Sequence, residues 1–426
     1  MVFAARVNAA PPPPPAPRRF LFLQGLASPF FARLGAALAE AGHGVEKLAF
    51  NGGDALFWPR ARIRDYAGTP DAWPAALAAL LAEGVTDLVL FGDGRPAHAR
   101  AIAVARAQGV TTWVFEEGYL RPGTIALEQG GVNADSPLPR DPDAIRALAQ
   151  GLPSVPREEG PGEPFPRRAA LDIAYNMRVL AGRGRFPHWR THRGWNVFHE
   201  YLGWARRGAL KPLRQRVSSR AMARVLAEAE AHPFILFPLQ LEGDFQVRRH
   251  SDLATVRHGV ERAIASLARH APPAMRLVVK GHPLDNGLVP WGRILRRVAA
   301  QEGVPGRVVY LDEVAYGPLL AASRGVLTIN STAGLQALRE GKPVALMGRA
   351  LYGLPGLVWQ RPLDGFWAAP AAPDMGLVDA LRRVLMAHAL VPGGFFSEPA
   401  IDRAVAGAAV RLLARSVMPR SVRHAA

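Results

Sequence analysis

Short apolar runs alternate with longer segments of helical periodicity along most of the chain. In the N-terminal part the predicted strands are residues 20–25, 45–50, 86–91 and 111–115, and the predicted helices are residues 28–41 and 96–108. Strands that alternate with helices form a parallel sheet that is covered on both faces. The pattern therefore predicts a Rossmann-like domain over residues 18–152.

The middle of the chain lacks this alternation. Residues 153–166 form a linker rich in proline, glycine and glutamate. Residues 169–230 have a mostly helical pattern, which the basic and aromatic stretch 183–195 interrupts. We interpret residues 153–232 as a helical, basic connector or insertion between two domains.

The alternation resumes after residue 232. The predicted strands are residues 233–241, 275–280, 307–311, 325–330 and 343–347, and the predicted helices are residues 253–269, 294–301, 317–322 and 332–339. This pattern indicates a second Rossmann-like domain, over residues 233–392. Two such domains facing a cleft make an α/β fold of the GT-B type, which many glycosyltransferases use, although a fold alone does not define a function.

The two ends of the chain fall outside these domains. Residues 1–17 contain a proline run and are predicted to be a disordered tail. Residues 393–426 are predicted to be a helix with a basic tail, in which residues 401–415 form either a basic amphipathic helix or a helix packed on the first domain. No run of about 18 apolar residues is free of charge, and the N-terminus lacks the order of a signal peptide. We therefore expect a cytoplasmic protein that is soluble or peripheral to a membrane.

The composition excludes several chemistries. The chain of 426 residues has no cysteine, which rules out disulfides, thiolate metal sites and a cysteine nucleophile. Its formal charge is +17, and arginine supplies nearly all of the positive charge because only Lys47, Lys211, Lys280 and Lys342 are lysines. The arginines are scattered, so an anionic membrane surface or a phosphorylated substrate is favoured over nucleic acid. The abundance of alanine, glycine, proline and arginine is also typical of a GC-rich coding bias.

Polar residues gather directly after predicted strands, where ligands bind in open α/β sheets. One such set follows a strand and opens a helix; it comprises Asn330, Ser331, Thr332 and Gly334. Free backbone N–H groups and the helix dipole favour a phosphate at such a turn. The alternative is a helix cap that binds no ligand.

Two further loops of the second domain carry candidate groups. Lys280 ends a strand and His282 follows it, so an ammonium and an imidazole can meet an anion there. The alternative for His282 is a hydrogen-bonded loop histidine. Gln240 and Asp244 follow the first strand of this domain. Asp244, like the nearby Glu242, is a candidate nucleophile, base or acid, and the alternative is an acidic turn that faces water.

The first domain has a comparable loop. Glu116, Glu117, Tyr119 and Arg121 come at the end of its last predicted strand, and Asn133 continues the same polar segment. Two carboxylates, a phenol and a guanidinium in one loop suit acid–base chemistry or substrate binding. The alternative is a cluster of surface ion pairs.

Two Gly-containing turns of the first domain complete the set of candidates. Gln24 and Ser28 lie in a strand-to-helix turn that is not GxGxxG, so no dinucleotide cofactor is expected. Asn51 and Asp54 flank two glycines, which let a ligand approach the backbone closely. Histidines never occur at metal-ligand spacing, so no bound metal is expected.

As an ordered set, seven segments of the chain resemble the capsular polysaccharide biosynthesis family of Gram-negative bacteria, of the KpsS/LipB type. The segments are FLQGLASPFF (22–31), FNGGDALFW (50–58), FEEGYLRPGTIALEQGGVNADS (115–136), FPLQLEGDFQVRRHS (237–251), VKGHPLDNG (279–287), INSTAGLQAL (329–338) and GKPVALMGRALYGLPGL (341–357). Each is weak alone, and their order makes them specific.

The resemblance implies a retaining β-Kdo glycosyltransferase that uses CMP-β-Kdo as donor, Kdo being 3-deoxy-D-manno-oct-2-ulosonic acid. It implies a phosphatidylglycerol-type lipid acceptor at the inner membrane, capsule assembly proteins as partners, and neither metal nor cofactor. Asp244 would then be the nucleophile and Glu117 the base, with Glu116 as second candidate. Lys280 and His282 would stabilise the leaving CMP.

Three alternatives stay open. One is a transferase of the same fold with another nucleotide-sugar donor. Another is a non-catalytic capsule assembly or export factor. The third is a nucleic-acid binder, which salt-sensitive duplex binding would reveal. If the acceptor is a lipid, the stretch 183–195 is a candidate contact with its headgroup, because it mixes arginines with aromatic residues.

Overall fold

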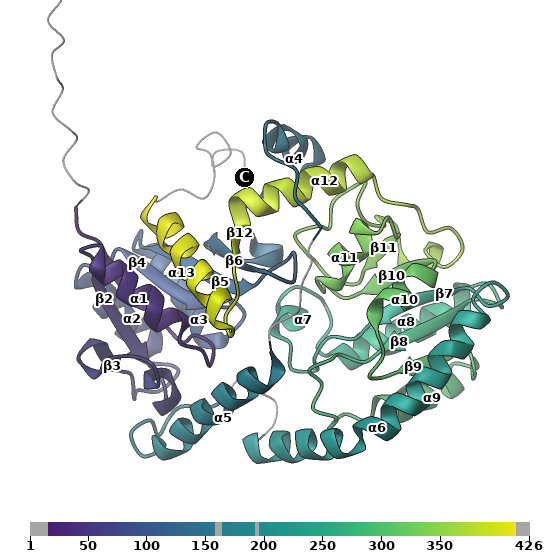
Figure 1. Ribbon diagram of the computed structural model, residues 1–426, viewed down its shortest axis with the longest axis horizontal. Helices are drawn as coiled ribbons and strands as arrows, with labels where there is room; N and C mark the ends of the chain where they lie inside the picture. The colour runs from purple at the N-terminus through teal and green to yellow at the C-terminus, as the bar shows by residue number, and fades with distance from the viewer. Residues whose placement is uncertain (1–15, 158–163, 192–195, 415–426) are drawn as a thin grey trace, which may run out of the picture.

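Two β-sheets organise the chain (Figure 1). The computed structural model describes residues 16–157, 164–191 and 196–414. The first sheet has the order β12-β6-β5-β4-β1-β2-β3, with strands β1 (Arg19–Phe22), β2 (Gly44–Ala49), β3 (Ile63–Asp65), β4 (Asp87–Phe91), β5 (Thr111–Glu117), β6 (Thr124–Gln129) and β12 (Leu390–Pro392). The second has the order β11-β10-β7-β8-β9, with β7 (Phe234–Pro238), β8 (Arg276–Lys280), β9 (Val308–Leu311), β10 (Gly325–Thr328) and β11 (Val344–Leu346). The predicted α/β fold with two Rossmann-like domains is confirmed.

The helices cover both faces of these sheets. In chain order they are α1 (Phe30–Glu40), α2 (Trp73–Ala82), α3 (Pro96–Ala107), α4 (Pro142–Ala149), α5 (Phe165–Ala181), α6 (Val197–Ala227), α7 (Phe245–Arg249), α8 (Val256–His270), α9 (Trp291–Gln301), α10 (Tyr316–Ala322), α11 (Ala333–Arg339), α12 (Met375–Val384) and α13 (Glu398–Leu413). Strand β1 illustrates the layering, because successive side chains of a strand point to opposite faces. Phe20 and Phe22 pack with α1 and α13, whereas Leu21 and Leu23 pack with α2 and α3.

One edge of the first sheet departs from the parallel arrangement. Strand β6 runs antiparallel to β5, with Phe115 opposite Leu127, and β12 runs antiparallel to β6. The sequence placed Asn133 in a polar segment that continues from the end of β5. Part of that segment, Thr124–Gln129, is instead the mostly buried strand β6. The departure is possible because antiparallel neighbours need only a short connection, whereas parallel neighbours need a crossover.

The C-terminal part of the chain returns to the first sheet. Strand β12 pairs there, although the sequence pattern placed residues up to 392 in the second domain. Helix α13 packs against α1 through buried Ile401, Ala404, Ala408 and Leu412. Of the two interpretations of segment 401–415, the helix packed on the first domain is the one observed for residues 401–413, and residue 415 lies outside the described residues. Helix α4 in turn packs on α12, beside the second sheet (Figure 1).

Helices α5 and α6 run along one edge of the molecule and link the two halves (Figure 1). Helix α5 lies against the 3-10 turn Gly52–Ala55, and α6 contacts β9. A Cβ atom on Gly52 would lie 2.2 Å from the carbonyl oxygen of Arg178, so glycine is required for the close approach of α5. No helix in the described ranges is both long and apolar enough to cross a membrane.

Candidate functional site

Loops at the carboxyl ends of the two sheets contact each other. Asn133, beyond β6, donates its side-chain amide to Gln246 of α7 at 3.0 Å. Arg249 pairs with Asp135 at 2.6 Å. Arg121, between β5 and β6, hydrogen-bonds to Thr332 at the start of α11. These contacts bring the candidate loops of both domains to one place.

Gln240 and Asn330 hold the candidate nucleophile Asp244 in a fixed orientation. The side-chain amide nitrogen of Gln240 donates to Asp244 Oδ2 at 3.1 Å and to Asn330 Oδ1 at 2.9 Å. The other oxygen of Asp244 accepts the backbone N–H of Gln246 at 2.9 Å and so caps α7. Burial raises the pKa of Asp244, and the hydrogen bond from Gln240 opposes that rise. Three residues that the sequence singled out therefore form one hydrogen-bonded unit.

Glu116 is the second carboxyl group of the site. It accepts the backbone N–H of Glu117 at 3.0 Å. Burial raises the pKa of Glu116 to about 8, and the negative charges of Glu117, Asp93 and Asp244 add to the rise. Glu116 belongs to the first domain and Asp244 to the second. Near neutral pH Glu116 therefore holds a proton that it can give up.

Glu117 has a different environment from Glu116. Its carboxylate pairs with Arg168 of α5 at 3.2 Å. The sequence favoured Glu117 over Glu116 as the base, whereas Glu116 is the carboxyl group whose pKa burial raises to about 8. Which of the two acts stays a prediction.

Positive groups surround His282 beyond β8. The ring Nδ1 accepts the backbone N–H of Leu284 at 3.0 Å, so the neutral ring carries its proton on Nε2 and can donate from there. Burial lowers the pKa of His282 to about 4, and the charges of Lys280, Arg121 and Arg168 lower it further. An uncharged N–H donor among three cations suits an anionic ligand. Lys280 itself donates to the carbonyl of Gly281 at 3.0 Å, and burial lowers its pKa.

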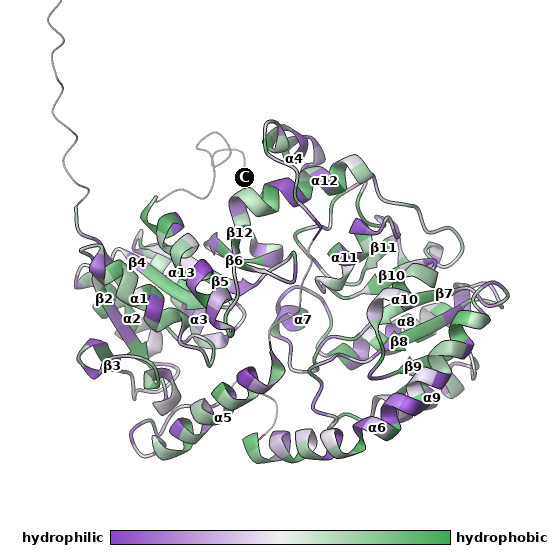
Figure 2. Ribbon diagram, in the orientation of Figure 1, coloured by the Kyte–Doolittle hydropathy of each residue, from purple (hydrophilic) through white to green (hydrophobic). Residues whose placement is uncertain are grey.

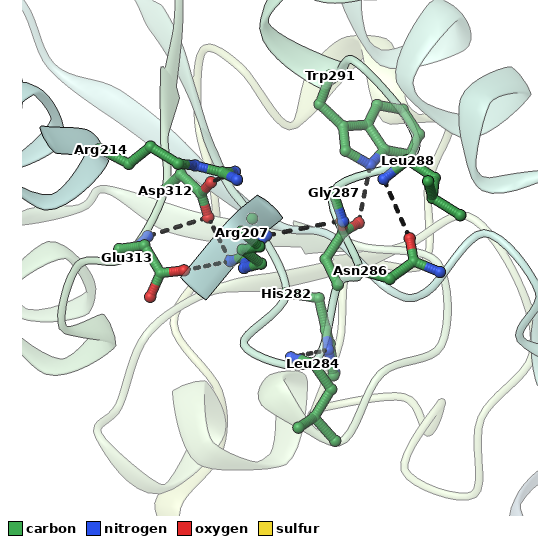
Figure 3. A network of polar contacts seen from close by, with 12 residues as sticks. Arg207, Arg214, His282, Leu284, Asn286, Gly287, Leu288, Trp291, Asp312 and Glu313 are labelled. Carbon is green, nitrogen blue, oxygen red and sulfur yellow. Dashed lines mark hydrogen bonds and ion pairs between the residues drawn. The ribbon is translucent and has the colours of Figure 1, made fainter. Parts of the chain in front are cut away.

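A buried ion network supports the loop that carries Lys280 and His282 (Figure 3). Arg207 of α6 lies 2.8 Å from Asp312, 2.7 Å from Glu313 and 3.6 Å from Asp285. Arg214, two turns further along α6, pairs with the other oxygen of Asp312. The network fastens the loops after β8 and β9 to α6.

The turn at Asn330–Gly334 is tightly packed. Ser331 Oγ accepts the backbone N–H of Ala333 at 3.2 Å, and the carbonyl of Ser331 accepts the hydroxyl of Tyr352. A Cβ atom at Gly334 would lie 2.2 Å from the Tyr352 hydroxyl oxygen, so this glycine makes room for the tyrosine. Ser331 thus satisfies one N–H at the start of α11, whereas the side chain of Thr332 at the N-cap position makes no capping hydrogen bond. The phosphate role of this turn stays a prediction.

Three candidate residues of the first domain meet on Tyr175 of α5. Its hydroxyl accepts from Gln24 at 2.8 Å and from Asn51 at 3.0 Å, and it donates to Asp54 at 2.9 Å. The glycine-rich turn expected to admit a ligand is thus occupied by α5. Tyr175, which the sequence did not single out, is the partner that these three polar side chains share.

Other candidates lie inside the fold. Tyr119 donates to Glu128 at 2.6 Å and accepts the backbone N–H of Asn133 at 2.7 Å. Burial raises the pKa of Glu128 to about 7. Ser28 donates to the carbonyl of Phe395 and accepts the backbone N–H of Phe30 at 3.1 Å. These hydrogen bonds hold the local structure, and substrate contacts of Tyr119, Asn133 and Ser28 stay predictions.

One group of side chains has donor atoms close enough for a metal. Within the described residues, Asp93, Asp135 and His250 bring one donor atom each to within 4.8 Å of one another. Sequence spacing alone missed this grouping because Asp93 is distant in sequence. Arg249 already pairs with Asp135. Burial lowers the pKa of His250 to about 4, and the charges of Arg249, Arg349 and Arg140 lower it further. We assign no metal there, and the expected absence of a metal stays a prediction.

Comparisons with known proteins identify the family. The family model for "Capsule polysaccharide biosynthesis protein" matches residues 86–396. The chain is 34% identical over 380 residues to the capsule polysaccharide export protein KpsS of Escherichia coli, covering 89% of this chain and 97% of that protein. The chain belongs to the capsule polysaccharide biosynthesis family. The resemblance inferred from the seven segments is confirmed.

One more curated protein and one solved structure are also similar to the chain. The capsule polysaccharide modification protein LipB of Neisseria meningitidis serogroup A is 34% identical over 386 residues, covering 89% of this chain and 91% of LipB. Among solved structures, KpsC of Thermosulfurimonas dismutans, a beta Kdo 2,7 transferase, aligns over 93% of this chain and 99% of its own, with 13% identity and a TM-score of 0.41.

Most residues near the candidate site that the sequence did not predict lie in the connector between the two domains. Arg168 and Arg207 lie on α5 and α6, far in sequence from the loops that they contact. Asp93 lies directly after β4, and Val132 donates its backbone N–H to it at 3.0 Å. Its position after a strand was an available signal, because the other candidates were found by that rule.

An open hollow of about 390 Å³ lies on the same edge of the second sheet. It is lined by residues 249–252, beyond β7, and residues 346–349, at the end of β11. None of the catalytic candidates lines it. Asp244, Glu116 and His282 therefore all lie outside the lining of this hollow.

Proposed function

We propose that this capsule-family protein is a retaining glycosyltransferase that moves Kdo from CMP-β-Kdo to a phosphatidylglycerol-type lipid. Family membership supports a role in capsule polysaccharide synthesis. The observation that carries the enzymatic part is the fixed carboxylate of Asp244, which accepts from Gln240 at 3.1 Å and from the backbone N–H of Gln246 at 2.9 Å. Burial raises the pKa of Asp244 and, in the other domain, that of Glu116. A non-catalytic export factor has no need for two acids whose pKa values are raised by burial.

The proposed reaction has two displacements. The carboxylate of Asp244 attacks the anomeric carbon of Kdo, and the bond to the phosphate oxygen breaks, so CMP leaves with the electron pair. His282 and Lys280 are placed to stabilise the leaving phosphate or the sugar carboxylate. The acceptor hydroxyl then attacks the same carbon and releases Asp244. Its proton passes to Glu117, or to Glu116 in molecules in which Glu116 is ionised, and two inversions give net retention.

The geometry favours Gln240 as the residue that positions the nucleophile. It holds one oxygen of Asp244, and Gln246 holds the other, so the carboxylate cannot rotate freely. Fixed orientation of a nucleophile lowers the entropic part of the barrier. No residue in this mechanism requires a metal or a cofactor.

The proposal is tested by CMP release from CMP-Kdo, generated in situ, with a fluorescent phosphatidylglycerol analogue as acceptor. We expect a lipid product that is heavier by one Kdo. Asp244→Asn should lose turnover by about a hundredfold or more while the fold is retained. The matched control is Asp252→Asn, since Asp252 is a surface residue with a side chain 68% exposed that pairs with Arg262.

Intact-protein mass spectrometry separates the two half-reactions. In Glu116→Gln the first displacement can proceed while the second is slowed, so a Kdo adduct on Asp244 should accumulate. An adduct that persists in Asp244→Asn would contradict the assignment of the nucleophile. CMP release without lipid product would retain the donor and reject the acceptor. No CMP release by folded protein would favour another nucleotide-sugar donor or an assembly role.

A further inference from the structure

Exposed large apolar side chains are concentrated on two helices. Eight of the eleven in the described chain lie on α5 and α6: Phe165, Ile173, Met177, Phe198, Leu202, Leu210, Leu213 and Val217. Figure 2 shows apolar residues along both helices, which follow the lower edge of the molecule in that view. Single exposed apolar residues are ordinary, but a concentration of them marks an interaction surface.

On α6 these side chains share one face. Phe198 and Leu202 are one turn apart, as are Leu213 and Val217, and the interval of eleven residues from Leu202 to Leu213 is close to three turns. Leu202 is 67% and Leu213 is 61% exposed. The opposite face, which includes Arg207, is buried against the second domain. A helix on a protein surface normally presents mostly polar residues outward, whereas α6 also exposes this set of large apolar side chains.

The outward face of α6 is also strongly basic. Arg220 lies eighteen residues after Leu202, which is five whole turns, and Arg216 lies one turn before Arg220. Both are exposed. Glu200 is the only acidic residue among the 31 residues of α6. Apolar side chains followed by arginines on one face match the two requirements for binding at an anionic bilayer surface.

Helix α5 extends this surface toward the candidate site. Phe165 of α5 contacts Trp204 of α6 with ring centroids 5.3 Å apart, and Asn176 donates to Tyr201 at 3.1 Å. Arg168, on the same helix as Phe165, pairs with Glu117. One helix thus carries both exposed apolar residues and a residue of the site.

The basic stretch that the sequence favoured for this role is arranged differently. Phe186 is buried, and Trp189 is partly buried against the first domain, although Arg183 and Arg190 are exposed. Residues 192–195 lie outside the described residues. The aromatic residues described in this stretch therefore serve packing, and the exposed apolar side chains are those of α5 and α6.

We infer that the exposed faces of α5 and α6 are a docking surface for an anionic phospholipid bilayer. The inference extends the proposed lipid acceptor but does not depend on the sugar donor. We favour a bilayer over a second copy of this chain as the partner of this surface. Two copies of the α6 face would repel each other because of its excess of arginine.

Vesicle flotation with the full-length chain tests the surface. We expect binding to vesicles of phosphatidylcholine with 30% phosphatidylglycerol, weak binding to phosphatidylcholine alone, and loss of binding as salt is raised. Leu202→Asp with Leu213→Asp should lower the partition coefficient by about tenfold or more, because both apolar anchors become anions. Arg216→Ser with Arg220→Ser should lower it by about tenfold for the anionic vesicles. The matched control is Val410→Asp, an apolar residue of α13 that is 70% exposed.

Several outcomes would overturn the inference. These are no binding by the unmodified chain, equal binding to both vesicle types, or unchanged binding by the Leu202/Leu213 variant. A dimer that this variant dissociates, measured by light scattering, would assign the surface to self-association instead. CMP release with a short-chain, water-soluble phosphatidylglycerol and no vesicles should be unchanged in the variant. Loss of vesicle binding with intact CMP release therefore separates this inference from the proposed reaction.

Discussion

Arg207→Met removes the central cation of the network in Figure 3. The side chain of Arg207 is 4% exposed and lies 2.8 Å from Asp312 and 2.7 Å from Glu313. Asp285 completes the set at 3.6 Å. Methionine occupies a similar elongated volume without charge, so the change tests the ion pairs more than the packing.

The magnitude follows from the burial of the carboxylates that remain. The side chains of Asp312 and Asp285 are 5% and 8% exposed, so water cannot replace the lost cation fully. Removing one partner of a buried ion pair costs roughly 3–5 kcal/mol. Arg214 still pairs with Asp312, which places the expected loss near the lower end, about 3 kcal/mol. That is a large share of a typical domain stability of about 5–15 kcal/mol.

Urea unfolding monitored by tryptophan fluorescence measures this loss. The matched control is Arg262→Met, whose exposed pair with Asp252 should contribute less than about 1 kcal/mol. Adding Asp312→Asn to Arg207→Met should recover part of the loss, because it removes one uncompensated charge. If Arg207→Met lost no more stability than Arg262→Met, the network would not be a stabilising element and the reasoning would fail.

Three other changes test the site and its supports. Burial raises the pKa of Glu116 from 4.5 to about 8, so the folded chain binds an extra proton between these pH values and its stability falls as pH rises through that window. The melting temperature of Glu116→Gln should therefore exceed that of the unmodified chain by more at pH 9 than at pH 5. An equal difference at both pH values would contradict the raised pKa. Tyr175→Phe removes the hydroxyl group that Gln24, Asn51 and Asp54 share. The variant should lose roughly 1–3 kcal/mol of stability and show faster amide hydrogen exchange in α5 than elsewhere. Unchanged exchange in α5 would count against an anchoring role of Tyr175. Gly334→Ala should lower stability by roughly 1–3 kcal/mol in thermal unfolding because its Cβ would meet Tyr352, and an unchanged melting temperature would show that the turn can yield.

The strand ends that carry the candidate site were predictable because their cause is local. The apolar runs that became β5, β7, β8 and β10 are bounded by polar residues, and the rule that ligands bind at strand ends led to Glu116, Asp244, His282 and Asn330. The family was also predictable, because it is carried by short segments in a fixed order. Short edge strands escaped prediction, since β12 has only three residues and its pairing partner β6 lies more than 250 residues earlier.

Sequence by itself determined the alternation of strands and helices, the absence of thiol chemistry and the identity of the polar loops, since each depends on residues that are near neighbours in the chain. Tertiary structure decided which of these residues meet. It joined Gln240 to Asn330, placed Arg207 among three carboxylates, and gave Gln24, Asn51 and Asp54 a common partner in Tyr175. It also decided which apolar residues of α5 and α6 stay exposed. Periodicity identifies an apolar helix face, but only the packed neighbours decide whether that face is covered.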